Sequence, residues 1–166
     1  MPNQLPDSLA NLGVSDGQSL NLFVFYHPRC PCTQSTARNL AKISAFLRND
    51  VNLTAFAYVP AEANESWLET STTREFAGIP GCTIALDSEA KMSRLFEVHT
   101  SGHVLLYGHR GELLFSGGIT PSRGHEGDCR SGNDLVRLIN DGLGSKDVPV
   151  EWPSFGCRIY SEEEIL

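Results

Sequence analysis

The stretch from Leu20 to Tyr26 constrains the fold more than any other part of this chain. It reads LNLFVFY, and only Asn21 interrupts a run of apolar and aromatic residues. A strand with apolar side chains on both faces is typical of the interior of a parallel or mixed sheet, whose two faces are both covered. The sequence therefore predicts an α/β domain with this strand in the middle of its sheet.

The rest of the chain alternates helices and strands at first and then ends with a hairpin and a helix. Apolar residues three and four apart predict the helices, and short apolar runs between turn residues predict the strands. The predicted elements are helix 33–47, strand 53–59, helix 65–76, strand 82–86, a helix from 87 through 96, strands 104–107 and 112–116, and helix 134–143. This order describes an α/β sandwich around a mixed sheet. We expect an irregular lead-in at 1–19, one domain at 20–144 and a tail at 145–166.

The charge and hydropathy of the chain exclude some classes of partner. The 166 residues carry a formal net charge of −7, which argues against nucleic acid or an anionic membrane surface. No apolar run approaches the ~20 residues that a membrane-spanning helix needs. The first residues lack the basic and apolar regions of a signal peptide. We expect a bacterial periplasmic protein if a leader or anchor was trimmed from this sequence, and a cytoplasmic protein otherwise.

Two cysteines lie at the junction between the first strand and the first helix, in the segment YHPRCPC. Proline is favoured at the first position of a helix, so Pro31 predicts Cys30 as the N-cap and Cys32 in the first turn. Free backbone N–H groups and the helix dipole stabilise a thiolate there and lower its pKa. Arg29 and a protonated His27 would add to this effect. The segment predicts a nucleophilic thiolate with a second thiol in reach, which are the two requirements of thiol–disulfide exchange.

The spacing of the two cysteines affects the disulfide that they can form. A Cys-X-Cys disulfide closes a tighter ring than a Cys-X-X-Cys disulfide, so its preferred dihedral angle is harder to reach. Strain makes a disulfide easier to reduce. We expect a more oxidising pair than Cys-X-X-Cys would give at the same place.

Four segments resemble the thioredoxin-like superfamily. They read NLFVFYHPRCPC, CTIALDSEAKMSRLFEV, SGHVLLYGHRGELLFSGGI and DLVRLINDGL. The resemblance implies a three-layer sandwich in which helices flank a central mixed sheet of about five strands. It also implies a protein dithiol or disulfide as substrate, bound against the loop at 101–103, and no organic cofactor. The wording around residues 101–128 is further similar to a bacterial RedB-type branch.

The chain departs from the family pattern at two places. Cys30-Pro31-Cys32 stands where the family has Cys-X-X-Cys, and Gly102-His103 stands where it has a cis-proline before the hairpin. By the same alignment, His103 lies beside the thiols, which opens an alternative. Cys30 and Cys32, with His103 or His27, would bind Cu(I) or Zn(II), similar to thioredoxin-like copper chaperones.

Thiol–disulfide exchange is the leading hypothesis, with Cys30 as the exposed attacking thiolate and Cys32 as the resolving thiol. His27 and His103 would be flanking polar groups. A thiol peroxidase ranks behind the metal-binding protein, because His27 occupies the place of the Thr or Ser in the peroxiredoxin motif. A catalytically inactive interaction module is the remaining alternative.

The glycine-rich loop from Gly117 to Gly132 is long, and long ordered loops are often functional. Its residues His125, Asp128 and Cys129 can line the site or join a metal cluster, and the alternative is a mobile surface loop without a role. In an oxidising compartment Cys129 and Cys157 can form a disulfide that ties the tail to this loop, with two free thiols as the alternative.

Overall fold

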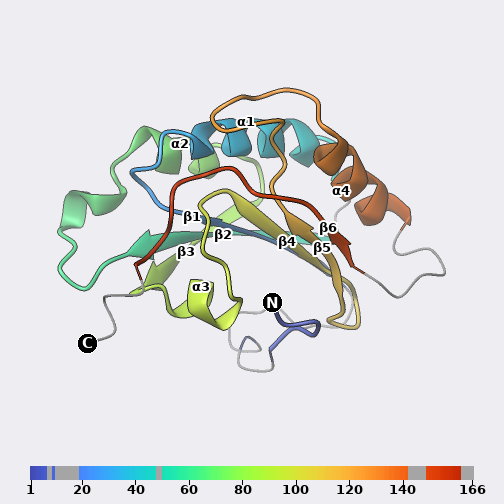
Figure 1. The fold of residues 1–166 in the computed structure, drawn as a ribbon, viewed down its shortest axis with the longest axis horizontal. Coiled ribbons are helices and arrows are strands. Elements are labelled where there is room, and N and C mark those ends of the chain that lie inside the picture. The colour runs from blue at the N-terminus through green and yellow to red at the C-terminus, as the bar shows by residue number, and fades with distance from the viewer. Residues whose placement is uncertain (7–8, 10–18, 48–49, 142–148, 162–166) are drawn as a thin grey trace.

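The structure is a computed structural model that describes residues 1–6, 9, 19–47, 50–141 and 149–161 (Figure 1). Its strands form one sheet in the order β3-β2-β1-β4-β5-β6, with β1 in the interior. The elements are β1 Leu20–Tyr26, α1 Thr33–Ser44, β2 Val51–Val59, a 3-10 helix Glu65–Leu68, α2 Ser71–Ala77, β3 Cys82–Ser88, α3 Lys91–Leu95, β4 His103–Tyr107, β5 Leu113–Gly117, α4 Arg130–Asp141 and β6 Val150–Glu151.

The sheet is mixed, as predicted. Strand β1 pairs in parallel with β2 and antiparallel with β4; β3 continues the parallel side, and β5 continues the antiparallel side. The sheet has six strands instead of about five. The additional strand, β6, comes from the predicted tail and pairs in parallel with Phe115 and Ser116 of β5.

The side chains of β1 explain the three layers. All seven residues of the strand are buried, and successive side chains point to opposite faces of the sheet. Leu22, Val24 and Tyr26 join the apolar cluster under α1, α2 and α4, which cover one face. Phe23 and Phe25 join the cluster on the other face, which α3 covers (Figure 1). The predicted three-layer α/β architecture is confirmed.

The C-terminal segment crosses the end of β4 instead of trailing away from the domain. Ile159 and Tyr160 are buried in the same cluster as Phe25. The backbone N–H of Ile159 donates to His99 O over 2.9 Å, and Arg158 forms an antiparallel bridge with Thr100. This segment therefore belongs to the folded unit and reaches the predicted site. Within the described residues, no helix is long and apolar enough to cross a bilayer.

Candidate active site

The turn between β1 and α1 presents the two cysteines. The backbone N–H of Cys30 donates to His27 O over 2.9 Å, and that of Thr33 donates to Cys30 O over 3.2 Å. These bonds close two four-residue turns ahead of the helix, and the α-helix begins at Thr33 with Cys32 as its N-cap. The prediction of Cys30 as N-cap and Pro31 as first helical residue is wrong by two positions. Both thiols still lie at the positive end of the helix.

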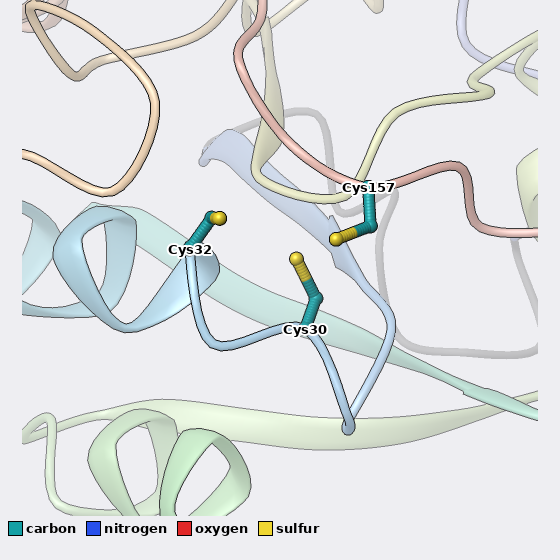
Figure 2. Close-up of side chains that lie close together, drawn as sticks. All are labelled: Cys30, Cys32 and Cys157. Carbon is teal, nitrogen blue, oxygen red and sulfur yellow. The ribbon is translucent and has the colours of Figure 1, made fainter.

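A third cysteine joins the predicted pair. The sulfurs of Cys30, Cys32 and Cys157 all lie within 4.8 Å of one another, and Figure 2 shows the thiols of Cys30 and Cys157 pointing toward each other. Cys157 reaches them from the C-terminal segment, because the backbone N–H of Ser101 donates to its carbonyl oxygen over 2.8 Å. All three are free thiols in this structure. We refer to these three residues as the thiol cluster.

The exposure of the cluster differs from the prediction. Cys30, predicted to be the exposed thiol, is only 1% exposed, whereas Cys32 and Cys157 are half-buried. The segment at Gly156 and Cys157 lies on the Ser101 loop next to Cys30, which explains why the turn does not expose this residue. Solvent reaches the cluster through Cys32 and Cys157.

Hydrogen bonds favour a thiolate at Cys30. Burial raises the pKa of this thiol, but hydrogen bonds from the Cys157 thiol, the Thr33 hydroxyl, the Cys157 backbone N–H and the Ser101 hydroxyl outweigh it. The pKa of Cys30 is therefore lowered from its ordinary value of 9.0. The hydrogen bond to Cys30 raises the pKa of Cys157, burial acts in the same direction, and Arg123 opposes them. Cys30 and Cys157 are thus matched as thiolate acceptor and thiol donor.

Replacing Thr33 by valine tests this account of Cys30. The hydroxyl of Thr33 lies 2.7 Å from that of Ser101, and both hydroxyls stabilise the thiolate. We expect the Thr33→Val variant to titrate Cys30 at higher pH and to lower its ionised fraction several-fold at neutral pH. The Cβ chemical shift of Cys30, followed against pH, measures this. Thr36→Val removes a buried hydroxyl one turn further along α1 and should leave the titration in place; equal curves for the two variants would contradict the account.

The cation next to the cluster is Arg123 and not Arg29. The Arg123 guanidinium lies 3.5 Å from Cys157 Sγ and also donates a hydrogen bond to Cys32. Its loop passes close to the site, because a Cβ on Gly124 would lie 3.9 Å from the sulfur of Cys32. Arg29 instead stacks over the Trp67 ring at 4.2 Å. The sequence did not indicate Arg123, because its proximity depends on the path of the long loop.

His27 stabilises the turn between β1 and α1 and does not stabilise the negative charge of a thiolate. Its Nδ1 accepts a hydrogen bond from the Arg29 backbone N–H over 3.1 Å, and its ring packs against those of Tyr58 and Trp67. Burial and the charge of Arg29 lower its pKa. A protonated His27 beside the thiols is therefore not what this environment favours. Its backbone N–H donates to Ser101 Oγ over 2.9 Å, which ties the turn to the loop that holds Cys157.

Comparison with known proteins identifies the fold. No family model and no curated protein matches the chain. A hypothetical protein from Sinorhizobium meliloti 1021 superimposes with a TM-score of 0.68 at 23% identity, over 94% of this chain and 88% of that one. An uncharacterized conserved protein from Geobacillus kaustophilus gives a TM-score of 0.64 at 18% identity, over 87% and 78% of the two chains.

A third structure belongs to a protein described by its activity. It is a secreted Mycobacterium tuberculosis disulfide oxidoreductase homologous to Escherichia coli DsbE, with a TM-score of 0.54 at 14% identity, over 78% of this chain and 84% of that one. The fold is thioredoxin-like. At these identities the comparison establishes the architecture of the domain, and its chemistry must be argued from its own residues.

The backbone at Gly102-His103, where the sequence resemblance would place a cis-proline, has a different structure in this thioredoxin-like fold. The described residues contain no cis peptide bond. Gly102 has φ +91°, and a Cβ there would lie 2.8 Å from Thr36 Oγ1, so the chain requires glycine at this place. The backbone N–H of Gly102 donates to Phe25 O over 2.8 Å, which holds the loop against β1.

His103, predicted to lie beside the thiols, is bound elsewhere. Its Nε2 lies 2.9 Å from Ser116 Oγ and its Nδ1 lies 2.8 Å from Ser154 Oγ. Burial and the nearby N-terminal ammonium lower the pKa of His103 to about 4. The predicted metal ligand set of Cys30, Cys32 and His103 is therefore not assembled in this structure. The third potential ligand among the described residues is Cys157.

The remaining site predictions concern the long loop. His125 is exposed, and its Nδ1 lies 3.0 Å from Ser122 Oγ and 2.9 Å from Arg123 O, so it supports the local turn of this loop. The predicted Cys129–Cys157 disulfide is not formed. Cys129 accepts a hydrogen bond from Gly132 N over 3.4 Å at the start of α4, whereas Cys157 lies in the thiol cluster. The spacing of the cysteines in the sequence does not show whether Cys157 lies beside Cys129 or beside Cys30 and Cys32.

Proposed function

We propose that this chain is a thiol–disulfide oxidoreductase that exchanges electrons with a dithiol or disulfide of a protein substrate. The observation that carries the proposal is the thiol cluster, whose sulfurs lie within 4.8 Å at the start of α1. Two of its thiols are open to solvent, and Cys30 has a lowered pKa. Thiol–disulfide exchange needs an accessible thiol and a nucleophilic partner close behind it. The RedB-type branch remains a prediction from the sequence.

The exposure of the thiols supports an order of attack. Cys32 is the half-exposed thiol of the Cys-Pro-Cys pair, so its thiolate attacks the substrate disulfide, forms a mixed disulfide and releases the first substrate thiolate. The Cys30 thiolate then attacks Cys32 Sγ. This forms the Cys30–Cys32 disulfide and releases the second substrate thiolate, so two electrons pass to the substrate. The reverse sequence oxidises a substrate dithiol.

Cys157 offers a second way to store the oxidised state. A Cys30–Cys32 disulfide closes the tight ring of a Cys-X-Cys pair, whereas Cys157 approaches from a separate segment. Attack of the Cys157 thiolate on Cys30 Sγ forms a Cys30–Cys157 disulfide and returns the Cys32 thiolate. The protein contains one disulfide before and after this step. The reduced substrate has already been released and is not affected.

Trapping of the mixed disulfide tests the function. The reduced, metal-free protein is mixed with a small protein that contains one disulfide, and the products are separated without reductant. The Cys30→Ser variant should accumulate a mixed disulfide on Cys32, and the accumulation should increase when Cys157→Ser is added, because both thiols within reach of Cys32 Sγ are then missing. Cys32→Ser should lower the exchange rate to that of an ordinary exposed cysteine. Cys82→Ser, in β3, is the control and should exchange like the unaltered protein.

The outcomes separate the function from the order of attack. A trapped substrate on Cys157 would overturn Cys32 as the entering thiol and keep the oxidoreductase. Exchange by the unaltered protein no faster than by a variant in which Cys30, Cys32 and Cys157 are all changed to serine would overturn the oxidoreductase itself.

A further inference from the structure

The thiol cluster has the composition and dimensions of a small metal site. Its three sulfurs lie within 4.8 Å of one another, and among the described residues no histidine or carboxylate completes the group. Metal–sulfur bonds of ~2.3 Å in a planar three-coordinate site place the sulfurs about 4 Å apart. The cysteines need shifts of less than about 1 Å to reach that geometry, which small rotations of their side chains provide.

The donors select the kind of metal. Thiolates are soft ligands, and among biological metals they favour Cu(I) and Zn(II). Zinc is almost always four-coordinate in protein sites, and a fourth ligand is missing from the described part of the chain. His103 cannot supply it without giving up its bonds to Ser116 and Ser154. Three sulfurs without a further donor suit Cu(I).

Charge and access favour the same ion. Three thiolates around one Cu(I) carry a net charge of −2, which needs positive partners when one ligand is buried. Cys32 is the N-cap of α1, whose N-terminus carries the positive end of the helix dipole, and the Arg123 guanidinium lies 3.5 Å from Cys157 Sγ. An arriving ion meets the half-buried thiols of Cys32 and Cys157 first, and buried Cys30 completes the site.

We infer that Cys30, Cys32 and Cys157 bind one Cu(I) ion through three sulfurs. Binding releases the protons of those thiols that are still protonated and changes the oxidation state of neither copper nor sulfur. The inference goes beyond the proposed exchange reaction and does not rest on it. Binding of Cu(I) and formation of a disulfide exclude each other, because any disulfide within the thiol cluster removes two of the three ligands.

Competition under anaerobic conditions tests the site. The fully reduced protein is titrated with Cu(I) in the presence of a chromogenic Cu(I) chelator, and X-ray absorption counts the donors. We expect one Cu(I) per chain with three sulfur donors. Cys157→Ser should weaken binding by at least about a hundredfold, since even loss of an outer-shell partner weakens metal sites by about ten- to a hundredfold. Cys129→Ser leaves the same number of cysteines as Cys157→Ser does, and it should bind Cu(I) like the unaltered protein.

A second variant shows whether weaker Cu(I) binding comes from the missing sulfur or from misfolding of Cys157→Ser. Cys32→Ser changes a half-buried side chain at the helix start and should give the same loss as Cys157→Ser. Equal Cu(I) affinity of Cys157→Ser and Cys129→Ser would overturn the inference. Coordination of Cu(I) by only two sulfurs, or by a histidine nitrogen, would also overturn the inference. Because disulfide exchange is measured on metal-free protein, failure of one activity leaves the other separately testable.

Discussion

Replacing Gly156 by alanine is expected to lower the free energy of unfolding by about 2–4 kcal/mol and to draw Cys157 out of the thiol cluster. A Cβ at this position would lie far inside van der Waals contact with Ser101 O and 2.9 Å from the Ser101 carbonyl carbon. Both are backbone atoms, so no side-chain rotation relieves the clash. The C-terminal segment must move away and lose the Ser101 N–H bond to Cys157 O.

Two measurements check this expectation. Denaturant unfolding gives the stability, and the alkylation rate of Cys30 reports whether the covering segment has moved. Gly78→Ala is the matched control, because a Cβ there meets only ordinary contacts, the nearest being Arg74 O at 3.4 Å. If Gly156→Ala is no less stable than Gly78→Ala and leaves Cys30 protected, the close approach of the two backbones does not hold the segment in place.

Acidification is expected to weaken the fold through His103. Its pKa is lowered from 6.5 to about 4 in the folded protein, so the unfolded chain binds more protons between these values. The stability that the neutral ring provides is complete above pH 6.5 and is lost as the pH falls toward 4. A shift of this size corresponds to about 3 kcal/mol, and the part of the side chain that keeps contact with solvent reduces the expected effect to about 2 kcal/mol.

The His103→Gln variant isolates this effect from other groups that titrate. Its amide can keep one of the bonds to Ser116 and Ser154 but has no proton to gain. We expect a lower stability at pH 7 and a flatter profile from pH 6.5 to 4.5 than in the unaltered protein. His109→Gln, at an exposed position of the β4–β5 turn, is the control. Parallel profiles for His103→Gln and the unaltered protein would contradict the assignment.

The fold could be predicted because its signals are local. Strand β1 was predicted with its observed bounds, since a run of seven mostly apolar and aromatic residues is short for a helix and typical of a buried strand. Helix α1 was predicted three residues too long, and α4 was predicted to begin four residues too late. Helix ends depend on capping contacts that apolar spacing does not encode. Strand β6 was missed because two residues are too few to show a period.

The site could be predicted only in part, for the same reason. Cys30 and Cys32 were found because the strand, the proline and the helix that position them are adjacent in sequence. Cys157 and Arg123 reach the cluster through a long loop and a segment without periodicity, so no local pattern indicates them. A glycine next to a cysteine in the irregular segment was the available signal, because glycine permits the close backbone approach seen at Gly156.

The distance along the chain between Cys32 and Cys157 has a consequence for biosynthesis. Cys30 and Cys32 leave the ribosome long before Cys157 has been translated, so the nascent domain exposes a two-cysteine site. An oxidant or a metal ion can react with these two thiols at this stage. The third sulfur arrives only when the C-terminal segment docks against Ser101. We therefore expect the three-sulfur cluster to assemble late in folding, when the C-terminal segment docks.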